Sequence, residues 1–256
     1  MTRAFQLKEV SVRYDAKEVL SKVRCDFDAG EFVAIAGPNG AGKSTLLGAM
    51  SGLRGSYSGS CLYRGKEIRK WDRKAFAREV SIVPQSVRID FPFTVEQVVL
   101  MGRAPFASSL FESDEDRYQV LRVMTLTGTT EFRDRDFRTL SGGEKQRVVV
   151  ASALAQMPSV LLLDEPAAFL DIEHQIALYR LLRNLCEGGV LVIAVTHDLN
   201  LAAAYASRVI LLRKGELVAD GLPSQVLDTH TLKDVFRVDV QIVTGPTGRP
   251  WIQYGG

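Results

Sequence analysis

The sequence has few cysteines, and they do not form the pairs that redox sites use. Its 256 residues include Cys25, Cys61 and Cys186, which are scattered along the chain without a C-x-x-C spacing. An odd and scattered set favours reduced packing residues of a cytosolic protein over a redox role. We therefore expect three reduced thiols that serve the packing of the core.

No stretch of the chain is long and apolar enough to cross a bilayer. The longest apolar runs, such as residues 190–195, are far shorter than the ~20 residues that a spanning helix needs. The first ten residues, MTRAFQLKEV, also lack the apolar core of a signal peptide. We expect a soluble chain that can lie on a membrane without crossing it.

The charge of the chain is almost balanced, with 32 basic and 30 acidic residues and a formal net charge of +2. Proteins whose main partner is nucleic acid usually carry a clear basic excess. The composition therefore gives no support for a nucleic-acid partner, and none is expected. With 46% hydrophobic residues, the chain has enough apolar side chains for a full core.

Two kinds of apolar pattern predict an α/β fold. Residues 5–14 and 19–27 alternate apolar and polar side chains, which predicts an antiparallel pair of strands with one solvated face. Continuous apolar runs separated by helical patterns predict parallel strands that are buried on both faces. These runs cover residues 32–36, 80–83, 160–163 and 190–195. A hairpin is expected over residues 209–219, and short helices and a second hairpin around residues 245–248 should finish the chain.

Between Gln85 and Met157 the pattern changes, because no buried-strand run occurs there. Residues 114–127 and 144–156 instead have the composition and spacing of helices. We therefore expect a single domain in which a helical subdomain is inserted into an α/β core with an antiparallel β subdomain. The predicted domain covers residues 1–256, the core and β subdomain roughly 1–85 and 157–256, and the insertion roughly 86–156.

The most specific motif, named here the phosphate loop, follows the first continuous apolar run. Residues 37–44, GPNGAGKS, fit the pattern G-x-x-x-x-G-K-[ST] between a predicted strand and a predicted helix. The glycines let backbone N–H groups surround phosphates, while Lys43 reaches the terminal phosphates and Ser44 offers its hydroxyl to Mg²⁺. The alternative is a glycine-rich turn, which the flanking strand and helix disfavour. The expected nucleotide-binding residues are Gly37, Asn39, Gly40, Ala41, Gly42, Lys43, Ser44 and Thr45.

Two carboxylates, Asp164 and Glu165, come directly after the buried run at 160–163. Asp164 is expected to hold Mg²⁺, directly or through water. Glu165 is expected to point toward the γ-phosphate and to accept a proton from an attacking water. By itself the pair would be interpreted as a strand that ends in solvated acids. The phosphate loop makes the catalytic interpretation the stronger one.

Polar side chains also follow two other predicted strands. Parallel strands bring their carboxyl ends to one edge of a sheet, so Gln85 and His197 can both face the γ-phosphate. We expect Gln85 to be a ligand of Mg²⁺ or of the water, and His197 to be a polar contact, although either could be an ordinary loop residue. Tyr14 can stack on a purine or can be an ordinary strand aromatic. His174 and His230 are interpreted as surface or packing residues.

The segment LSGGEKQ, residues 140–146, predicts a second anion site, named here the second cradle. Ser141 and two glycines lead into helix-forming residues, so free N–H groups should point out of a helix N-terminus. One chain would not easily bring both cradles to a single nucleotide. Two identical chains around a twofold axis can do so, each giving its second cradle to the nucleotide of the other.

Together these motifs resemble the nucleotide-binding subunit of an ATP-binding cassette (ABC) transporter over essentially the whole chain. The resemblance implies a P-loop NTPase core of the ABC ATPase type, ATP and Mg²⁺ as cofactors, and a homodimer with ATP at its interface. Ser141 and Gly143 would then contact the ATP of the other chain, Glu165 would be the general base and His197 would sense the γ-phosphate. The resemblance further assigns Tyr14 as the adenine-stacking aromatic and Asp171 to the loop after the carboxylates.

Three segments look more narrowly like the importer branch for iron–siderophores, haem and cobalamin. In that branch a substrate-binding protein delivers the ligand to a transmembrane permease dimer. The segment after Gln85 is similar to the surface on which the permease docks, although its apolar residues could equally be subdomain core. The implied function is ATP hydrolysis that powers metal-chelate import, at the cytoplasmic face of the inner membrane. The three segments are residues 91–106, 170–175 and 197–212.

Other classes of ABC ATPase are the alternatives. An exporter cassette is opposed only by the importer-like segments. A soluble ABC ATPase of DNA repair is opposed by the short spacing between the cradles, and a ribosomal one by the single cassette. Ala167, Phe169 and Ser152 depart from the residues common in the family, which are Thr, a small residue and Arg, but none of these changes removes a catalytic group.

Overall fold

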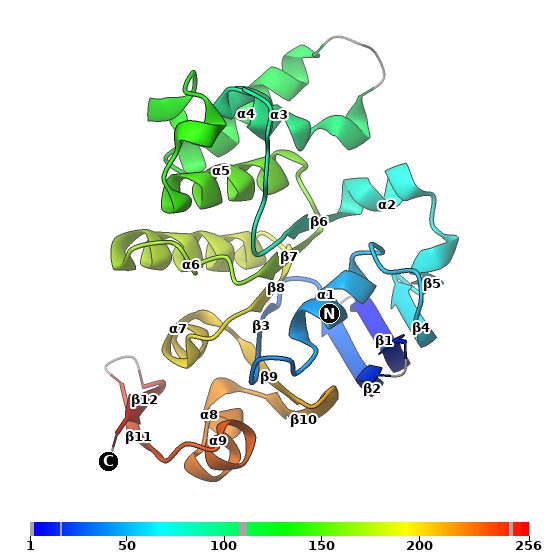
Figure 1. Cartoon of the computed structure of the whole chain (residues 1–256), viewed down its shortest axis with the longest axis vertical. Coiled ribbons are helices and arrows are strands. Elements are labelled where there is room, and N and C mark those ends of the chain that lie inside the picture. Colours follow the sequence, from blue (N-terminus) through cyan, green and yellow to red (C-terminus); the bar gives the residue numbers. More distant parts are fainter. Residues whose placement is uncertain (1–2, 16, 108–111, 246–247, 256) are drawn as a thin grey trace. The chain divides into compact units, whose positions relative to one another are not determined.

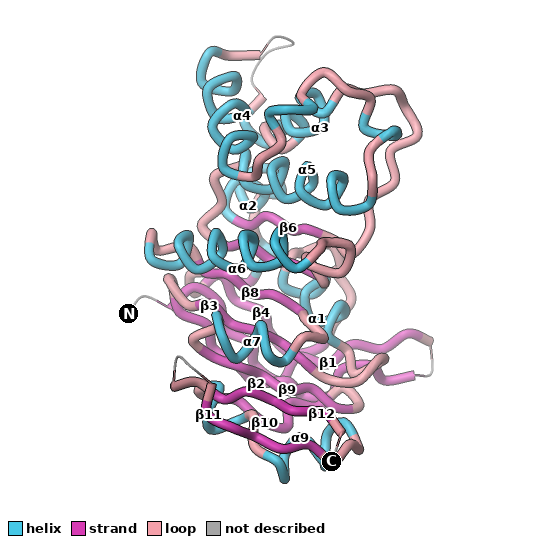
Figure 2. Tube along the Cα trace, turned by 90° about the vertical axis from the view of Figure 1, so that its left-hand side faces the viewer, coloured by secondary structure: helices cyan, strands magenta, loops and turns pink. Residues whose placement is uncertain are grey.

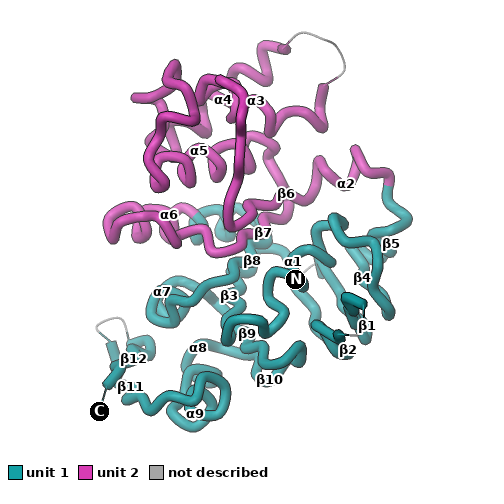
Figure 3. The backbone as a smooth tube through the Cα atoms, in the orientation of Figure 1, with its two compact units in different colours: residues 1–71, 182–256 teal, residues 72–181 magenta. Residues whose placement is uncertain are grey.

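The computed structural model describes residues 3–15, 17–107, 112–245 and 248–255 (Figure 1). The chain divides into two compact units, unit 1 with residues 1–71 and 182–256, and unit 2 with residues 72–181 (Figure 3). None of the helices in the described ranges has the length and apolar character needed to span a bilayer. The single domain with an insertion over 86–156 stays a prediction.

Unit 1 contains an antiparallel sheet and a mainly parallel one. Their strands are magenta in Figure 2. The antiparallel sheet has the strand order β2-β1-β4-β5, formed by β1 (Arg3–Tyr14), β2 (Lys17–Asp28), β4 (Ser58–Tyr63) and β5 (Lys66–Glu67). The other has the order β10-β9-β3-β8 within this unit, formed by β3 (Phe32–Ala36), β8 (Leu191–Val195), β9 (Arg208–Arg213) and β10 (Glu216–Gly221). The antiparallel pairing of β1 with β2 and the hairpin of β9 and β10 confirm two predictions.

The buried runs of unit 1 lie where the sequence predicts them. β3 is parallel to both β8 and β9, and every residue of β3 and β8 is buried. Helix α7 (Leu199–Tyr205) packs against β3, and α1 (Lys43–Met50) contacts β2. The C-terminal hairpin is also present, although Pro246 and Thr247 at its predicted turn lie outside the described residues. The remaining elements are α1 (Lys43–Met50), the 3₁₀ helix η1 (Ile68–Lys70), α7 (Leu199–Tyr205), α8 (Pro223–Val226), α9 (Thr229–Phe236), β11 (Val240–Thr244) and β12 (Pro250–Tyr254).

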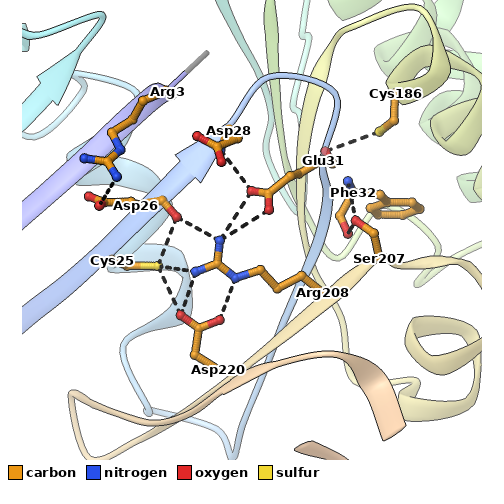
Figure 4. A network of polar contacts seen from close by, with 10 residues as sticks. All are labelled: Arg3, Cys25, Asp26, Asp28, Glu31, Phe32, Cys186, Ser207, Arg208 and Asp220. Atoms are coloured by element: carbon orange, nitrogen blue, oxygen red, sulfur yellow. Dashed lines mark hydrogen bonds and ion pairs between the residues drawn. The ribbon is translucent and has the colours of Figure 1, made fainter. Parts of the chain in front are cut away.

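Arg208 joins β9 to β10 and to the antiparallel sheet (Figure 4). Its Nε and Nη2 donate to the two carboxylate oxygens of Asp220 at 2.6 and 2.7 Å. Its Nη1 donates to the carbonyl of Asp26 on β2 at 2.8 Å and lies 3.3 Å from the carboxylate of Glu31. These contacts, led by the hydrogen bond to Asp220, raise the pKa of Arg208. The cation is therefore permanent, and it neutralises two half-buried acids.

All three cysteines are buried and free, as the sequence predicts. Cys25 lies beside the Arg208 network, with its Sγ 3.5 Å from Nη2 of Arg208. Burial raises the pKa of Cys25 and Cys61, and it raises the pKa of Cys186 to about 12. The thiols therefore stay protonated at neutral pH, and thiols of this kind are chemically inert.

Replacement of Arg208 by Ala should destabilise the chain strongly. The side chains of Arg208 and Asp220 are only 22% and 24% exposed, so the acids would be left half-buried without their cation. We expect the free energy of unfolding in urea to fall by roughly 2–4 kcal/mol. Arg13→Ala is the control, because the pair of Arg13 with Glu18 is well exposed, and it should change stability by no more than about 0.5 kcal/mol. Equal effects of the two variants would contradict a central role for the network.

Unit 2 is mostly helical. Its two strands, β6 and β7, pair in parallel register from Val80 opposite Val160 to Val83 opposite Leu163, as the buried runs predict. Among the described residues between these strands, the regular elements are helices. Thr94 and Asp136 also form an isolated β-bridge there. The elements are α2 (Arg73–Glu79), β6 (Val80–Val83), α3 (Val95–Met101), η2 (Ala104–Phe106), α4 (Asp114–Leu126), η3 (Thr130–Phe132), η4 (Phe137–Thr139), α5 (Gly142–Ala155), β7 (Val160–Asp164) and α6 (Ile172–Glu187), which ends in unit 1.

The helices of unit 2 form one cluster and confirm the predicted helical ranges. α3, α4 and α5 pack on one another, and they bury Val99, Val123 and Val148. α4 and α5 correspond to the predicted helices at 114–127 and 144–156, and α5 begins two residues earlier. The earlier start follows from a capping box, which sequence periodicity does not report.

Backbone hydrogen bonds join the segment after Gln85 to the segment before the second cradle. The N–H of Val95 donates to the carbonyl of Arg135 at 3.0 Å, and the N–H of Phe137 donates to the carbonyl of Phe93 at 2.9 Å. Arg135 also forms an ion pair with Glu144 inside the second cradle at 3.1 Å. The two segments are therefore held together within unit 2 by hydrogen bonds and an ion pair.

Candidate active site

The phosphate loop follows β3 in unit 1 and has the backbone that its glycines predict. Gly37 has a φ of 151° and Gly42 a φ of 102°, which L side chains rarely adopt. A Cβ at Gly37 would lie 2.1 Å from the carbonyl oxygen of Leu212, and one at Gly42 would lie 2.8 Å from that of Val19. Only glycine fits at both positions, so the loop is held in one curled shape between β2 and β9.

The first turn of α1 is open to an anion. Gly42 is the N-cap and provides no side-chain hydrogen bond, so the N-terminal N–H groups are left for a ligand. The side chain of Lys43 is buried and lies back over the loop, where Nζ donates to the carbonyls of Gly37 and Pro38 at 2.8 and 3.0 Å. Ser44 is exposed on the same turn, whereas Thr45 is buried. Asn39 and Gly40 form the exposed tip of the loop.

Tyr14 and His197 belong to the same unit as the phosphate loop. Tyr14 ends β1 and is 39% exposed, and the adjacent β2 packs Val19 and Leu20 against Gly42. His197 is exposed two residues beyond β8, and the N–H of Thr196 donates to the carbonyl of Ile35 at 3.0 Å. Tyr14 therefore ends a strand that pairs with β2, and His197 follows a strand that pairs with β3.

Gln85, Asp164 and Glu165 belong to unit 2. Asp164 ends β7 with only 9% of its surface exposed. Gln85 follows β6, and its Nε2 donates to Oε2 of Glu165 at 2.9 Å. The parallel pairing of β6 with β7 thus brings together two predicted residues that are 80 positions apart in the sequence. The meeting of these three residues with the phosphate loop stays a prediction.

Glu165 has an unusual backbone. Its φ is 52°, in the left-handed region that residues other than glycine, asparagine and aspartate rarely occupy. Such conformations cost of order ~1–3 kcal/mol and gather at functional sites. The turn directs the carboxylate toward Gln85.

The second cradle is the capped N-terminus of α5. Ser141 Oγ accepts from the N–H of Glu144 at 3.3 Å, and the Glu144 carboxylate accepts from the N–H of Ser141 at 2.7 Å. The backbone bond from Ser141, followed by its side-chain bond, lowers the pKa of Glu144. Ser141 is exposed. A Cβ at Gly143 would lie 3.1 Å from the carbonyl oxygen of Phe169, which is a crowded position for a side chain. The Phe169 side chain, which differs from the small residue common in the family that the sequence resembles, lies beside Gly142 and is 56% exposed.

Asp171 is held by a residue that the sequence patterns did not single out. Its Oδ1 accepts from the backbone N–H of His174 at 2.9 Å and lies 2.7 Å from Nδ1 of the same histidine. These bonds, with the backbone bond the larger cause, lower the pKa of Asp171. The spacing Asp-x-x-His at a helix start is the sequence signal that would have revealed the pair. The interpretation of His174 as a surface or packing residue did not include this contact with Asp171.

The donors fit a nucleotide and its metal. The curled loop, the open helix end and Lys43 provide N–H groups and a cation, which suit a triphosphate. Ser44 in unit 1, and Gln85 and Asp164 in unit 2, each offer oxygen atoms, the ligands that Mg²⁺ prefers. Their binding to one ion stays a prediction.

Comparisons with known proteins agree with these features. A family model described as ABC transporter matches residues 20–168. The chain is 43% identical to the hemin import ATP-binding protein HmuV of Streptomyces coelicolor, over 92% of this chain and 84% of that protein. It is similar to an inward-facing conformation of a metal-chelate type ABC transporter, with a TM-score of 0.84, 25% identity and coverage of 99% and 98% of the two chains. It is also similar to a dimeric post-hydrolysis state of the ATP-binding cassette MJ0796 with ADP and Pi, with a TM-score of 0.78, 28% identity and coverage of 86% and 98%.

These likenesses confirm the fold class predicted from the sequence, an ABC ATPase core of the P-loop NTPase type with an antiparallel β subdomain and a helical subdomain. The family model spans more than half of the chain, and the relative is similar over nearly all of it. The chain belongs to the ABC transporter family, as an ATP-hydrolysing cassette.

Proposed function

We propose that this chain powers the import of a metal chelate through a transmembrane permease. The observation that carries the proposal is the 43% identity to a hemin import ATP-binding protein over 92% of the chain. The similarity extends over 235 residues, which leaves little of the chain outside it. An iron–siderophore, haem and cobalamin are the candidate chelates, and the relative makes haem the first to test.

In this proposal the residues of both units act on one ATP. Lys43 and the loop N–H groups bind the β- and γ-phosphates, and Tyr14 stacks on the base. Bound Mg²⁺, held by Ser44, Asp164 and Gln85, would neutralise charge on the phosphates. Glu165 takes a proton from the attacking water, and the amide of Gln85 keeps that carboxylate in place. His197 contacts the γ-phosphate, and Asp171 belongs to the loop beside the second cradle.

The two cradles are explained by a homodimer. A helix N-terminus with two exposed or half-exposed glycines can approach an anion closely, and the second cradle has this form. Ser141 and Gly143 of each chain would contact the ATP held by the phosphate loop of the other. The dimeric cassette with ADP and Pi supports this arrangement.

The docking surface for the permease would be the segment after Gln85. Phe91 is 70% exposed and its ring centroid lies 6.1 Å from that of Phe93, whereas Val95 is fully buried. The apolar residues of the segment are thus divided between surface and core. Because this segment is bonded to the one that leads into the second cradle, a permease seated on Phe91 can influence Ser141. The chain would then lie at the cytoplasmic face of the membrane, and a substrate-binding protein would act through the permease.

Replacement of Ser141 by Arg should prevent closure of the ATP dimer. The large cation would occupy the space of the γ-phosphate and would remove the cap of α5. We expect sedimentation to show no ATP-dependent dimer, while ATP binding by the monomer stays within about twofold of wild type. Ser113→Arg is a matched control, because Ser113 caps α4 in the same way. A normal ATP-dependent dimer would refute the two-chain explanation.

Reconstitution tests the transport function. The chain and its permease would be placed in vesicles, and ATP hydrolysis would be measured with haem-, siderophore- or cobalamin-loaded binding proteins. We expect one loaded protein to stimulate hydrolysis and inward transport, and Phe91→Asp to abolish the stimulation without reducing basal hydrolysis. Transport out of the cell without a binding protein would instead favour an exporter. Full activity without any membrane partner would favour a non-transport ATPase.

A further inference from the structure

Arg54 covers one face of the Tyr14 ring, and we propose that it positions this ring for the base of the nucleotide. The inference rests on the proposed role of Tyr14 as the base-stacking aromatic. The guanidinium carbon of Arg54 lies 4.7 Å from the centroid of the Tyr14 ring, within the range of a cation–π contact. Since a phenol ring has two faces, the guanidinium leaves the opposite face for the base.

Helix α1 fixes the place of Arg54. The backbone N–H of Arg54 donates to the carbonyl of Gly48 at 3.1 Å. The side chain then crosses the helix at Gly48, because a Cβ there would lie 2.8 Å from Nε and 2.9 Å from Cδ of Arg54. Glycine is a poor helix former, and the arginine stem gives the physical reason for its presence in the middle of α1.

The same helix carries the phosphate loop. α1 begins at Lys43, and Gly48 lies five residues further along, which corresponds to a rise of about 7.5 Å. A helix held at its first turn by the phosphates also holds the turn on which Arg54 lies. Phosphate binding and ring orientation are therefore properties of one rigid element. The sequence patterns did not identify Arg54, because it follows the helix in a loop without a motif.

An oriented ring should favour stacking. Tyr14 ends a strand and is 39% exposed, so part of its side chain faces solvent and the contact with Arg54 helps to fix its orientation. A side chain that is already held in its bound orientation loses less conformational freedom when a ligand binds. Stacking does not distinguish one purine from another, so the effect should be the same for ATP and GTP. The affinity for a ligand without a base should not depend on Arg54.

Arg54→Ala should weaken ATP and GTP binding by about two- to fivefold, the range expected for loss of an exposed cation–π contact. Titration calorimetry on the full chain would measure ATP, GTP and inorganic tripolyphosphate. Tripolyphosphate affinity should be unchanged. Arg54→Lys should restore most of the loss, because an ammonium also binds an aromatic face.

Two further variants test the route through the ring. In a Tyr14→Ala background, Arg54→Ala should cause no additional loss. Gly48→Ala should reproduce the loss, because the new Cβ displaces the arginine stem, and it should have no effect on base affinity when Arg54 is already Ala.

Several results would overturn the inference. Tighter ATP binding by Arg54→Ala would mean that the guanidinium competes with the base. An equal loss for tripolyphosphate would mean that Arg54 acts by its charge alone. If Tyr14→Ala lowered the affinity for ATP and Arg54→Ala did not, only the role of Arg54 would be rejected. If Tyr14→Ala kept its affinity for ATP while Lys43→Ala lost most of it, the proposed base site on which the inference rests would be rejected.

Discussion

Replacement of Glu165 by Gln should leave an almost inactive enzyme that accumulates as an ATP-loaded dimer. The amide retains the size of the side chain and can still bond to Gln85, but it cannot take a proton from water. Loss of a positioned base typically lowers the rate by ~10²–10⁴-fold. Loss of the negative charge also removes repulsion of the triphosphate, so ATP should remain bound. Single-turnover hydrolysis and sedimentation with ATP and Mg²⁺ would measure both effects.

Two controls separate the proposed base from its surroundings. Glu173→Gln makes the same change at an exposed position of α6, and its rate should stay within about twofold of wild type. Asp164→Asn alters a proposed metal ligand instead, so binding and hydrolysis should both decrease. Hydrolysis at the wild-type rate by Glu165→Gln would show that another group takes the proton.

Replacement of Lys43 by Ala should abolish useful ATP affinity. Nζ of Lys43 lies inside the loop, where it now donates to two carbonyls and can turn to the β- and γ-phosphates. A hydrogen bond to a charged group contributes about 1.5–3 kcal/mol, so loss of two should weaken binding by roughly 100-fold or more. Equilibrium binding of ATP would measure this effect. Lys8→Ala, at an exposed site on β1, should bind ATP normally, and unchanged affinity in Lys43→Ala would refute the phosphate-loop assignment.

The elements and the nucleotide motifs could be predicted because they depend on local pattern. The alternation over residues 5–14 and the buried run at 160–163 identify strands, since a strand exposes or buries side chains with a fixed period. The loop at 37–44 is a motif in which the two glycines, Lys43 and Ser44 have separate physical reasons. The sequence also predicts that Gln85 and Glu165 follow parallel strands, but their hydrogen bond and the pairing of β6 with β7 come from the structure.

Contacts between segments without a pattern could not be predicted. Arg208 meets Asp220 through a hairpin and Asp26 across 182 positions, and no periodicity relates these residues. The contact of Arg54 with Tyr14 depends on the missing Cβ of Gly48. The backbone of Glu165 is equally invisible, because glutamate is not a residue type that signals a positive φ.

The left-handed backbone of Glu165 has a consequence for directed evolution. Its conformation opposes folding by about 1–3 kcal/mol, and glycine at this position would relieve that strain. A library of variants selected only for heat resistance should therefore accumulate glycine or asparagine at position 165. The selected variants should survive heating but hydrolyse little ATP.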